Sequence, residues 1–437
     1  MESIAIGVSA IGIALLLTLL GVPVAVALGL VGFGGLYMVG GPVLLTSAAD
    51  TLAYNALNQY SFAVIPTFIL MGILANRAAI TNDLYEAFYR ILSRVRGSLY
   101  LVTILSSAGF ATISGSTIVS AAVFTKLSLP QMTRFGYDKG IAAGCIAAAG
   151  TFASLIPPSI MMVIYALLTG ESIGRLFVAG VVPGVLTAVV YLIFIVGLVR
   201  LKPSIAPKVD RIFSGKEKLQ SIRRIGPFLV LSTIVIGGIY SGLMFPSAAG
   251  AVGAAGALGI AIWRGVGSPK EIRDSLVETA VSTGTIFLVL IGGLLFARFL
   301  VYSGFITDVV EVISKSQIEP WQVLVAVILF NLVLGMFIDT VSITVVTVPF
   351  LHPIMVELGY DPIWFGILLI KLIEISAISP PVGLNLFAVM ASARSEITSA
   401  DLFRGVVPFL CVELALLVLI IVFPTISLWL PNLVYGQ

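Results

Sequence analysis

One polar pattern occurs twice in this chain, each time within long apolar sequence. The first copy contains Ser114-Gly115-Ser116-Thr117, Gly136-Tyr137-Asp138 and Pro157-Pro158-Ser159, and the second contains Asp339-Thr340-Val341-Ser342, Gly359-Tyr360-Asp361 and Pro380-Pro381-Val382-Gly383. A shift of 223 residues places Ser116 on Asp339, Gly136 on Gly359 and Pro157 on Pro380. In each copy a proline pair interrupts the apolar stretch that follows the polar cluster. The pattern predicts two re-entrant tips facing two broken helices, and so an ion and substrate site inside a membrane.

The composition agrees with a membrane location. The chain is 59% hydrophobic and only 10% charged, with a mean hydropathy of +1.13, whereas a soluble domain carries about 25% charged residues. Backbone polar groups within a bilayer must be satisfied inside the protein, which favours helices. We therefore expect an all-α polytopic membrane protein surrounded by lipid. The formal charge of +3 bears on orientation in the membrane and predicts no nucleic-acid partner.

The duplication extends beyond the tips. Pro23 falls on Pro246 and Pro130 on Pro353 at the same shift, and the sequence Gly-Val-Val-Pro that ends at Pro183 recurs with two residues of slippage. A shared shift across several matches indicates an internal repeat. We predict a first repeat over 1–224 and a second over 225–437. In these repeats, scaffold helices occupy about 1–96 and 225–316, and a hairpin with a broken helix occupies about 97–170 and 319–393.

Apolar segments are expected at about 22–40, 279–301 and 403–432, among others, and the apolar segments around each proline pair are short. Those at about 159–169 and 381–393 fall below the ~20 residues that a helix needs to cross a bilayer. Short segments at corresponding places of two halves are the best sequence pointer to a transporter binding site. Two charged, partly apolar segments, 81–96 and 305–316, are either interfacial helices that join a fixed frame to a mobile part or ordinary amphipathic connectors.

The crossing count predicts that the two repeats are inverted. Each half has three full spans, a hairpin without net crossing, one broken span and one final span, and this odd total reverses the orientation of the second half. Basic residues gather in the loops that this count puts on one side, which is therefore cytoplasmic: Arg200, Lys202, Lys208, Arg211, Lys216, Lys218, Arg223, Arg224, Arg90, Arg94, Arg96, Lys126, Arg134, Lys139, Arg264, Lys270, Arg273, Arg394 and Arg404. The other side receives Asp50, Glu171, Asp308, Glu311 and Glu319. Both termini are then expected on the non-cytoplasmic side.

The first tip and its facing break offer neutral oxygen atoms. Ser114 and Ser116 flank a glycine, and the break at Pro157-Pro158 removes two N–H donors and frees carbonyls upstream. Na⁺ is a hard cation that prefers oxygen ligands, and unwound helices coordinate it through such carbonyls. The alternative is that these hydroxyls only hydrogen-bond their own or a neighbouring helix.

The second tip adds a carboxylate. Asp339 lies in a deeply apolar stretch, where acids are costly and by default functional. A Na⁺ ligand and a proton site both fit, and a helix cap is the structural alternative. We therefore predict two unequal cation sites, of which the site with Asp339 is the more sensitive to pH.

Several residues are candidates for contact with an anionic substrate. Thr117, Thr340 and Ser159 stand at the tips and at the first break, where helix N-termini favour anions. Arg298 is either a further contact or a cation that reaches the outer interface. Lys371 and Glu374 are three residues apart and are expected to pair on one helix.

Enzyme chemistry is not indicated. The sequence contains no nucleophile–base set, P-loop or metal-ligand spacing, so we expect no enzyme, no organic cofactor and no metal beyond Na⁺. Without a nucleotide site, the energy source must be an ion gradient.

With these motifs assembled, the chain resembles the large membrane (permease) subunit of tripartite ATP-independent periplasmic (TRAP) transporters. The likeness covers nearly the whole chain, and its most specific pieces are Gly109 to Ser120, Pro130 to Asp138, Ala149 to Ser159, Gly335 to Thr340 and Pro380 to Phe387. The resemblance implies an elevator-type, Na⁺-driven importer of an organic acid such as a C4-dicarboxylate or sialic acid. It also implies a bacterial or archaeal inner membrane with periplasmic termini, a small four-helix membrane subunit and a periplasmic substrate-binding protein.

The resemblance assigns ligands to the two cation sites by position. The first Na⁺ site would use Ser114 and Ser116 with carbonyls near Ala153, Ile156 and Pro158. The second would use Asp339 and the hydroxyl of Ser379, with carbonyls around Gly335 and Val382.

Three positions depart from the family pattern. The family usually has threonine where this chain has Ser379, and glycine where it has Ala153. The sequence Phe245-Pro246-Ser247-Ala248 stands where the family often reads Thr-Pro-Thr-Glu, so no role of that glutamate carries over.

Two other classes stay open. One is a stand-alone Na⁺- or H⁺-coupled anion symporter that needs no binding protein. The other is an intramembrane enzyme, which is disfavoured because Ser116 takes the place of a second acid opposite Asp339.

Overall fold

The computed structural model describes residues 2–58, 60–207, 213–316, 318–393 and 396–436. Over these ranges the regular elements are all helical. Nine described helices are long and apolar enough to cross a membrane, and a tenth span results if the bent pair around the first proline break counts as one. The predicted all-α polytopic membrane fold is therefore confirmed. Lys208, Arg211 and Arg394 lie outside the described residues.

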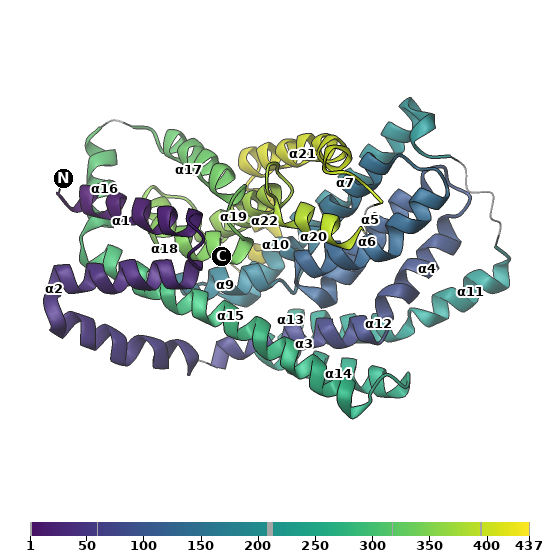
Figure 1. Cartoon of the computed structure of the whole chain (residues 1–437), viewed down its shortest axis with the longest axis horizontal. Helices are drawn as coiled ribbons and strands as arrows, with labels where there is room; N and C mark the ends of the chain where they lie inside the picture. Colours follow the sequence, from purple (N-terminus) through teal and green to yellow (C-terminus); the bar gives the residue numbers. More distant parts are fainter. Residues whose placement is uncertain (1, 59, 208–212, 317, 394–395, 437) are drawn as a thin grey trace.

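One group of helices, which we call the frame, comes from the first part of each half. It consists of α1 (Glu2–Leu19), α2 (Val24–Leu57), η1 (Tyr60–Ala63), α3 (Val64–Arg77), α12 (Gly226–Ser232), a π-helical turn η3 (Thr233–Gly237), α13 (Gly238–Tyr240), α14 (Pro246–Trp263) and α15 (Pro269–Tyr302). Helix α2 runs along α15, and α3 runs along α14 (Figure 1). At Gly32 and Gly35 the chain of α2 comes so close to α15 that a side chain would overlap it.

The remaining large group, which we call the core, holds the hairpins and broken helices. It consists of α5 (Ser98–Ser114), α6 (Thr117–Arg134), α7 (Lys139–Gly150), α8 (Phe152–Leu155), α9 (Ile160–Thr169), α10 (Ile173–Leu201), α17 (Pro320–Gly335), α18 (Thr340–Glu357), α19 (Pro362–Ala377), α20 (Leu384–Ser392), α21 (Ser399–Val422) and α22 (Thr425–Tyr435). The hairpin arms have 16 to 18 residues, which is about 24–27 Å against ~30 Å of hydrocarbon. Both predicted hairpins and both Pro-Pro breaks are present, in the same order in each half.

Four shorter helices connect these groups. They are α4 (Ile80–Leu92), η2 (Pro203–Ile205), α11 (Gly215–Arg224) and α16 (Phe305–Lys315). Helix α4 packs on α5 and α11, and α16 packs on α1 and α18. The two amphipathic segments are thus helices between frame and core, as both sequence interpretations allow. The repeat boundary at 224/225 stays a prediction.

Three predicted segments have different limits in the structure. The segment expected at 403–432 divides into α21 and α22 at Pro424, because proline has no N–H and disfavours a helical residue before it. The segment expected at 22–40 continues to Leu57 across a kink at Gly41, whose φ is 63°. The segment expected at 279–301 begins at Pro269, where Ser268 and Glu271 form a capping box.

The repeated Gly-Tyr-Asp motif forms the turn that joins each hairpin to its broken helix. Gly136 and Gly359 have φ values of 72° and 88° and end α6 and α18, which glycine does without steric cost. Asp138 then accepts a hydrogen bond from the N–H of Ile141 at 2.8 Å and caps α7. Asp361 caps α19 in the same way.

The core is held together by a close crossing of α7 and α21. A Cβ atom on Gly144 would overlap the carbonyl oxygen of Gly405, and a Cβ on Gly405 would overlap that of Gly140. Small residues permit such backbone approach between membrane helices, where packing drives association. This crossing joins a helix of the first broken span to the last long helix of the second half.

We expect Gly405→Ala to lower the free energy of unfolding by about 1–3 kcal/mol, the usual cost of overpacking. Thermal unfolding of the purified chain in one detergent measures this change. Gly259→Ala is the matched control, because Gly259 is also helical and nothing lies within 4 Å of its Cβ position. Equal unfolding temperatures for the two variants would contradict the packing argument.

Candidate functional site

The first tip gathers two serine hydroxyls around a glycine turn. Helix α5 ends at Ser114, Gly115 takes a left-handed φ of 60°, and Ser116 begins α6. The Ser114 hydroxyl donates to the carbonyl of Ser116 and accepts from its N–H, both at 3.3 Å. The Ser116 hydroxyl accepts weakly from the N–H of Val119 at 3.5 Å. The tip therefore holds its oxygen atoms together in a compact turn.

The tip lies directly against the first break. A Cβ on Gly115 would lie 3.1 Å from the carbonyl oxygen of Pro158. The Pro157-Pro158 peptide bond is cis, and Ile156 before it is extended. The structure thus brings the Pro158 carbonyl to the tip of the two serines, as the predicted first cation site requires. Ala153 of α8 is fully buried at the same break.

Ser159 has a structural role at this break. Its hydroxyl donates to the carbonyl of Ser154 and accepts from the N–H of Met162 at 3.4 Å, so it caps α9. It is 1% exposed. Contact of Ser159 with a substrate stays a prediction.

Asp339 of the second tip caps α18. Its Oδ1 accepts hydrogen bonds from the N–H groups of Val341 at 3.1 Å and Ser342 at 3.0 Å. Within the described chain, both hydrogen bonds to this carboxylate end on that one oxygen. The residue is half-buried. The carboxylate can therefore cap the helix through Oδ1 and still offer Oδ2 to a cation, so the two sequence interpretations are compatible.

The second tip also meets its break. A Cβ on Gly335 would overlap the side chain of Ser376, so the end of α17 lies on the end of α19. Gly383 has a φ of 54°, and a Cβ there would lie 2.9 Å from the carbonyl oxygen of Ser379 and 3.0 Å from that of Ala377. Carbonyl oxygens freed by the break thus surround a position that only glycine can occupy.

The remaining predicted ligands of the second cation site lie at this break. The Ser379 hydroxyl donates to the carbonyl of Ile375 at 2.7 Å and keeps its lone pairs for another partner. Val382 follows the cis Pro380-Pro381 bond and is half-buried.

Helix ends of both signs converge at each tip and break. Helices α5, α8, α17 and α19 end there, and α6, α9, α18 and α20 begin there. C-terminal ends carry partial negative charge and suit a cation, whereas N-terminal ends carry partial positive charge and suit an anion. The site can thus hold a cation and an anion side by side.

The two broken helices are linked across the repeats. The Nδ2 of Asn385 in α20 donates to the carbonyl of Ala147 in α7 at 3.3 Å. The hydroxyl of Tyr165 in α9 donates to the carbonyl of Pro362 in α19 at 2.7 Å. Neither contact could be predicted from the sequence, because they join residues 238 and 197 positions apart.

The substrate candidates divide between core and frame. Thr117 and Thr340 are the first residues of α6 and α18 and are buried. Arg298 is half-buried on α15 of the frame, five residues beyond Gly293, which lies against Val345 of α18.

A buried ionic cluster adds residues that the sequence reasoning missed. The predicted Lys371–Glu374 pair is confirmed at 3.0 Å. Glu413 of α21 lies 2.5 Å from the same ammonium, and Tyr191 of α10 donates to Glu413. The sequence feature that could have indicated this cluster is Glu413 itself, a glutamate within the 24-residue apolar helix α21.

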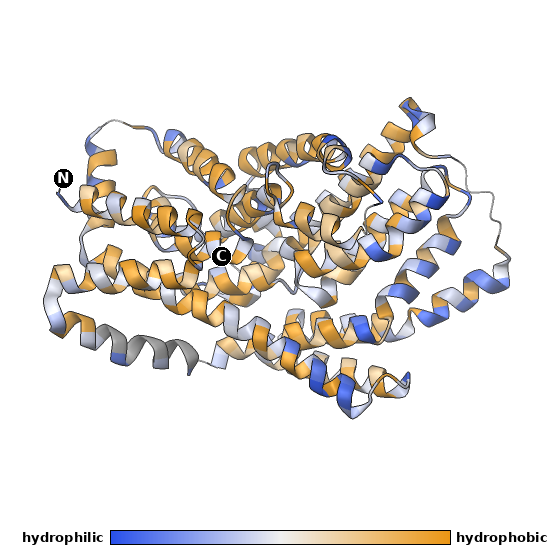
Figure 2. Cartoon of the chain, viewed as in Figure 1, coloured by the Kyte–Doolittle hydropathy of each residue, from blue (hydrophilic) through white to orange (hydrophobic). Residues whose placement is uncertain are grey.

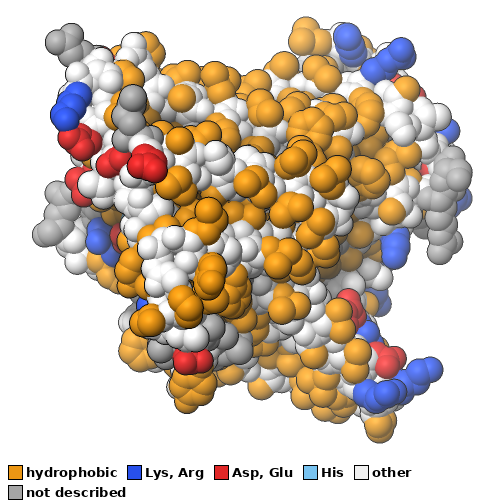
Figure 3. All heavy atoms as spheres, turned by 60° about the vertical axis from the view of Figure 1, so that its left-hand side comes forward, with side chains coloured by type: hydrophobic (Ala, Val, Ile, Leu, Met, Phe, Trp, Pro, Cys, Tyr) orange, Lys and Arg blue, Asp and Glu red, His pale blue; other side chains and the backbone are white. Residues whose placement is uncertain are grey.

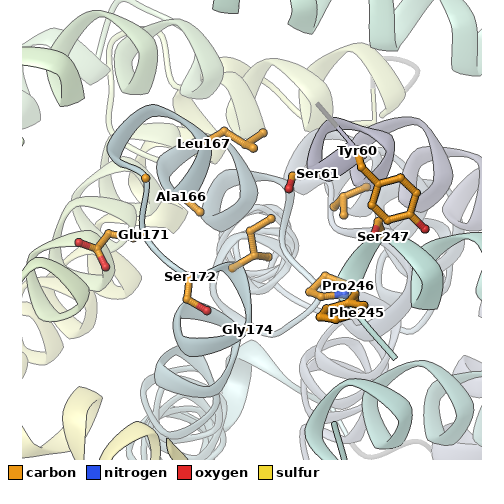
Figure 4. Close-up of a pocket in the computed structure, with 13 residues that line it drawn as sticks. Tyr60, Ser61, Ala166, Leu167, Glu171, Ser172, Gly174, Phe245, Pro246 and Ser247 are labelled. Carbon is orange, nitrogen blue, oxygen red and sulfur yellow. The ribbon is translucent and has the colours of Figure 1, made fainter. Parts of the chain in front are cut away.

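A cavity of about 400 Å³ lies between residues of the frame and residues of the core. Figure 4 shows Glu171 and Ser172 on one side and Tyr60, Phe245 and Ser247 on the other. The segment that departs from the family pattern thus lines this cavity. Burial, with the nearby charge of Asp361 next, raises the pKa of the Glu171 carboxyl above its ordinary value.

Comparisons with known proteins agree on one family. Residues 11–426 match the family model described as "Tripartite ATP-independent periplasmic transporter, DctM component". The C4-dicarboxylate TRAP transporter large permease protein of Pseudomonas aeruginosa is 33% identical over 87% of this chain and 88% of its own. The sialic acid TRAP transporter large permease protein of Vibrio cholerae is 29% identical over 93% of this chain and 96% of its own. The crystal structure of the Alcanivorax borkumensis YdaH transporter has the same fold, with a TM-score of 0.59 at 12% identity, and the match covers 89% of this chain and 90% of that one.

The contact of Gly335 with Ser376 gives a testable coupling. Gly335→Ala should destabilise the chain by about 1–3 kcal/mol because the new methyl group overlaps Ser376. Ser376→Gly alone should cost about 1 kcal/mol through helix propensity. The double variant should be more stable than the sum of the two losses predicts. Thermal unfolding in detergent measures all three, and strict additivity would show that α17 and α19 do not touch there.

Proposed function

Because this chain belongs to the DctM family of tripartite ATP-independent periplasmic transporter components, we propose that it couples the import of an organic acid to a Na⁺ gradient. It is a multi-pass membrane protein and a transporter permease subunit, not an enzyme. Beyond this family-level function, the coupling ion, the substrate class and the mechanism are what we propose. The observation that carries it is the approach of each tip to a helix break with freed carbonyl oxygens.

The coupling ion follows from the oxygen atoms at the two breaks. The first offers the hydroxyls of Ser114 and Ser116 with the carbonyl of Pro158. The second offers Asp339 with the carbonyls around Gly383. Oxygen ligands without imidazole or thiolate suit a hard cation such as Na⁺.

The substrate class follows from the charge of the site. Four helix N-termini favour an anion beside the cation, and Thr117 and Thr340 at two of them can donate hydrogen bonds. C4-dicarboxylates and sialic acid, for which the two relatives are named, are carboxylates. We therefore propose a carboxylate substrate, with Arg298 as a contact from the frame.

The mechanism is proposed from the separation of frame and core. The core holds both tips and both breaks, and the amphipathic helices α4 and α16 connect it to the frame. An elevator movement would carry the core, with its ions and solute, past the frame. In keeping with its family, we propose that a small membrane subunit and a periplasmic binding protein assist this subunit.

The charge distribution supports an inner-membrane orientation with periplasmic termini. Figure 2 shows hydrophilic residues near the ends of α4, α11 and α14, whereas the helices in the middle of the molecule are mostly apolar. Figure 3 shows Asp and Glu concentrated at one edge, together with a few Lys or Arg, and Lys and Arg concentrated at the opposite edge, with fewer Asp and Glu among them. Cytoplasmic loops are enriched in basic residues.

We expect NaCl to raise the unfolding temperature above that in choline chloride, because a bound ion stabilises the folded state by an amount on the order of 1–3 kcal/mol. Asp339→Asn should lose most of this gain while keeping the fold, since asparagine is an equally good cap. Asp361→Asn is the matched control, because Asp361 is also a capping aspartate but is exposed at the far end of α19. Full Na⁺ stabilisation of Asp339→Asn would remove this carboxylate from the site.

Reconstituted uptake tests the whole proposal. Proteoliposomes with this chain, the small subunit and the binding protein from neighbouring genes should take up a radiolabelled C4-dicarboxylate or sialic acid only with an inward Na⁺ gradient. Uptake driven by a proton gradient alone would contradict Na⁺ coupling. Equal uptake without the binding protein would favour a stand-alone anion symporter.

The orientation has its own test. Alkaline phosphatase fused after the last residue should be active, because it folds only in the periplasm, and green fluorescent protein at that position should be dark. The same reporters inserted in the basic loop after Pro203 should give the reverse. The same reporter result at both positions would contradict the odd number of membrane crossings in each half.

A further inference from the structure

The ionic cluster of α10, α19 and α21 lies outside both predicted cation sites. Lys371 and Glu374 of α19 and Glu413 of α21 are 0–1% exposed. The Lys371 ammonium contacts Glu413 Oε2 at 2.5 Å, and donates to Glu374 Oε2 at 3.0 Å and to the Thr187 hydroxyl of α10 at 3.1 Å. Tyr191 donates to Glu413 Oε1 at 2.5 Å.

The groups that face this cluster can be named helix by helix. Besides the two residues of α19 itself, α10 contributes Thr187 and Tyr191, and α21 contributes Glu413. Aromatic rings from α8 and α21 close the space around Tyr191. A further titratable group close to Tyr191 is the buried thiol of Cys145 on α7. Tyr165 of α9, another helix packed against α19, donates a hydrogen bond to the carbonyl of Pro362 at the opposite end of α19. In the described chain, Lys371 is therefore the one cation in ion contact with the two glutamates.

The formal charges of the cluster do not cancel. One ammonium and two carboxylates leave a net charge of −1 in a dry interior. An uncompensated buried charge costs several kcal/mol, and the group takes up a proton instead. One of the two glutamates must therefore be protonated.

The contacts identify which one. Glu413 has a polar neighbour at each oxygen: Tyr191 donates to Oε1, and the Lys371 ammonium makes an ion contact with Oε2, although without a hydrogen bond in the described structure. Glu374 meets the ammonium only through Oε2 and at the longer distance, and its buried Oε1 has no hydrogen-bond partner in the described structure. Glu413 is the better stabilised anion. We propose that Glu374 is a buried proton-binding site that holds its proton on Oε1 at neutral pH.

The site belongs to the second repeat alone. The shift of 223 residues places Lys371 on Ala148 and Glu374 on Thr151, which are uncharged. The proton site lies on α19, which ends two residues before Ser379. The Ser379 hydroxyl donates to the carbonyl of Ile375, the residue after Glu374. Loss of the proton puts a negative charge about one helical turn from the second break. This negative charge raises the affinity of the second break for a cation and opposes release of the cation. Transport therefore falls at alkaline pH.

Infrared spectroscopy tests for the proton directly. The full chain with its small subunit in nanodiscs should show the C=O stretch of a protonated carboxylic acid at neutral pH. This band should be missing in Glu374→Gln and retained in Glu357→Gln, a control at the exposed end of α18. A Glu374→Gln spectrum identical to that of the wild type in this region overturns the proposal.

The infrared band alone does not show which of the two glutamates carries the proton, and the unfolding temperatures of the two variants distinguish them. Glutamine imitates a protonated glutamate, so Glu374→Gln should unfold at the wild-type temperature. Glu413→Gln should unfold at a clearly lower temperature, because it removes the closest partner of the buried Lys371. The reverse order would place the proton on Glu413 and overturn the assignment.

Transport provides the functional readout. Glu374→Gln proteoliposomes should retain uptake at neutral pH and lose the alkaline decline of the wild type. Loss of uptake at every pH in a Glu374→Gln chain with wild-type stability, or an unchanged alkaline decline, would overturn the proposed link to the cation site. The spectroscopic and stability results do not depend on which cation drives transport.

Discussion

A backbone group left without a partner inside a bilayer is costly, and this constraint shapes the whole core. Each proline pair breaks a helix in the middle of apolar sequence and leaves carbonyl oxygens that no helix satisfies. The chain covers each break with a hairpin tip. Gly115 lies against the Pro158 carbonyl, and Gly383 lies among the carbonyls of Ala377 and Ser379. The same exposed oxygens that make the break expensive make it suitable for a cation.

The two copies solve this problem with different chemistry. Ser116 and Asp339 occupy the same place in the repeat, and each caps the second arm of its hairpin. The serine does so through a long contact and contributes no charge, whereas the aspartate holds two N–H groups on one oxygen. The asymmetry continues along the broken helices, where the ionic pair of α19 has only Ala148 and Thr151 as counterparts. Among the described residues of the core, the buried charged side chains therefore lie in the second half.

Movement of the core past the frame would require a unit that stays intact. Within the core, buried contacts join the two repeats: the glycine crossing of α7 and α21, the Asn385–Ala147 bond and the ionic cluster of α10, α19 and α21. A neutral cluster is easier to carry through a low-dielectric environment than a charged one. The proposed proton on Glu374 would keep the cluster neutral.

The sequence alone determined the membrane class, the hairpins and the broken helices, because long apolar runs, glycine turns and proline pairs act locally along the chain. It also predicted the Lys371–Glu374 pair and the place of Asp339 at the second tip, which depend on residues in a single segment. The ends of α2, α15 and α21 were less predictable, since a kink, a capping box and a proline adjust them. Only the tertiary structure decided that Glu413 and Tyr191 join Lys371, that Asn385 reaches Ala147, and that α7 crosses α21 at three glycines. Those contacts join residues from separate helices, and the sequence of one helix does not show which other helix it will pack against.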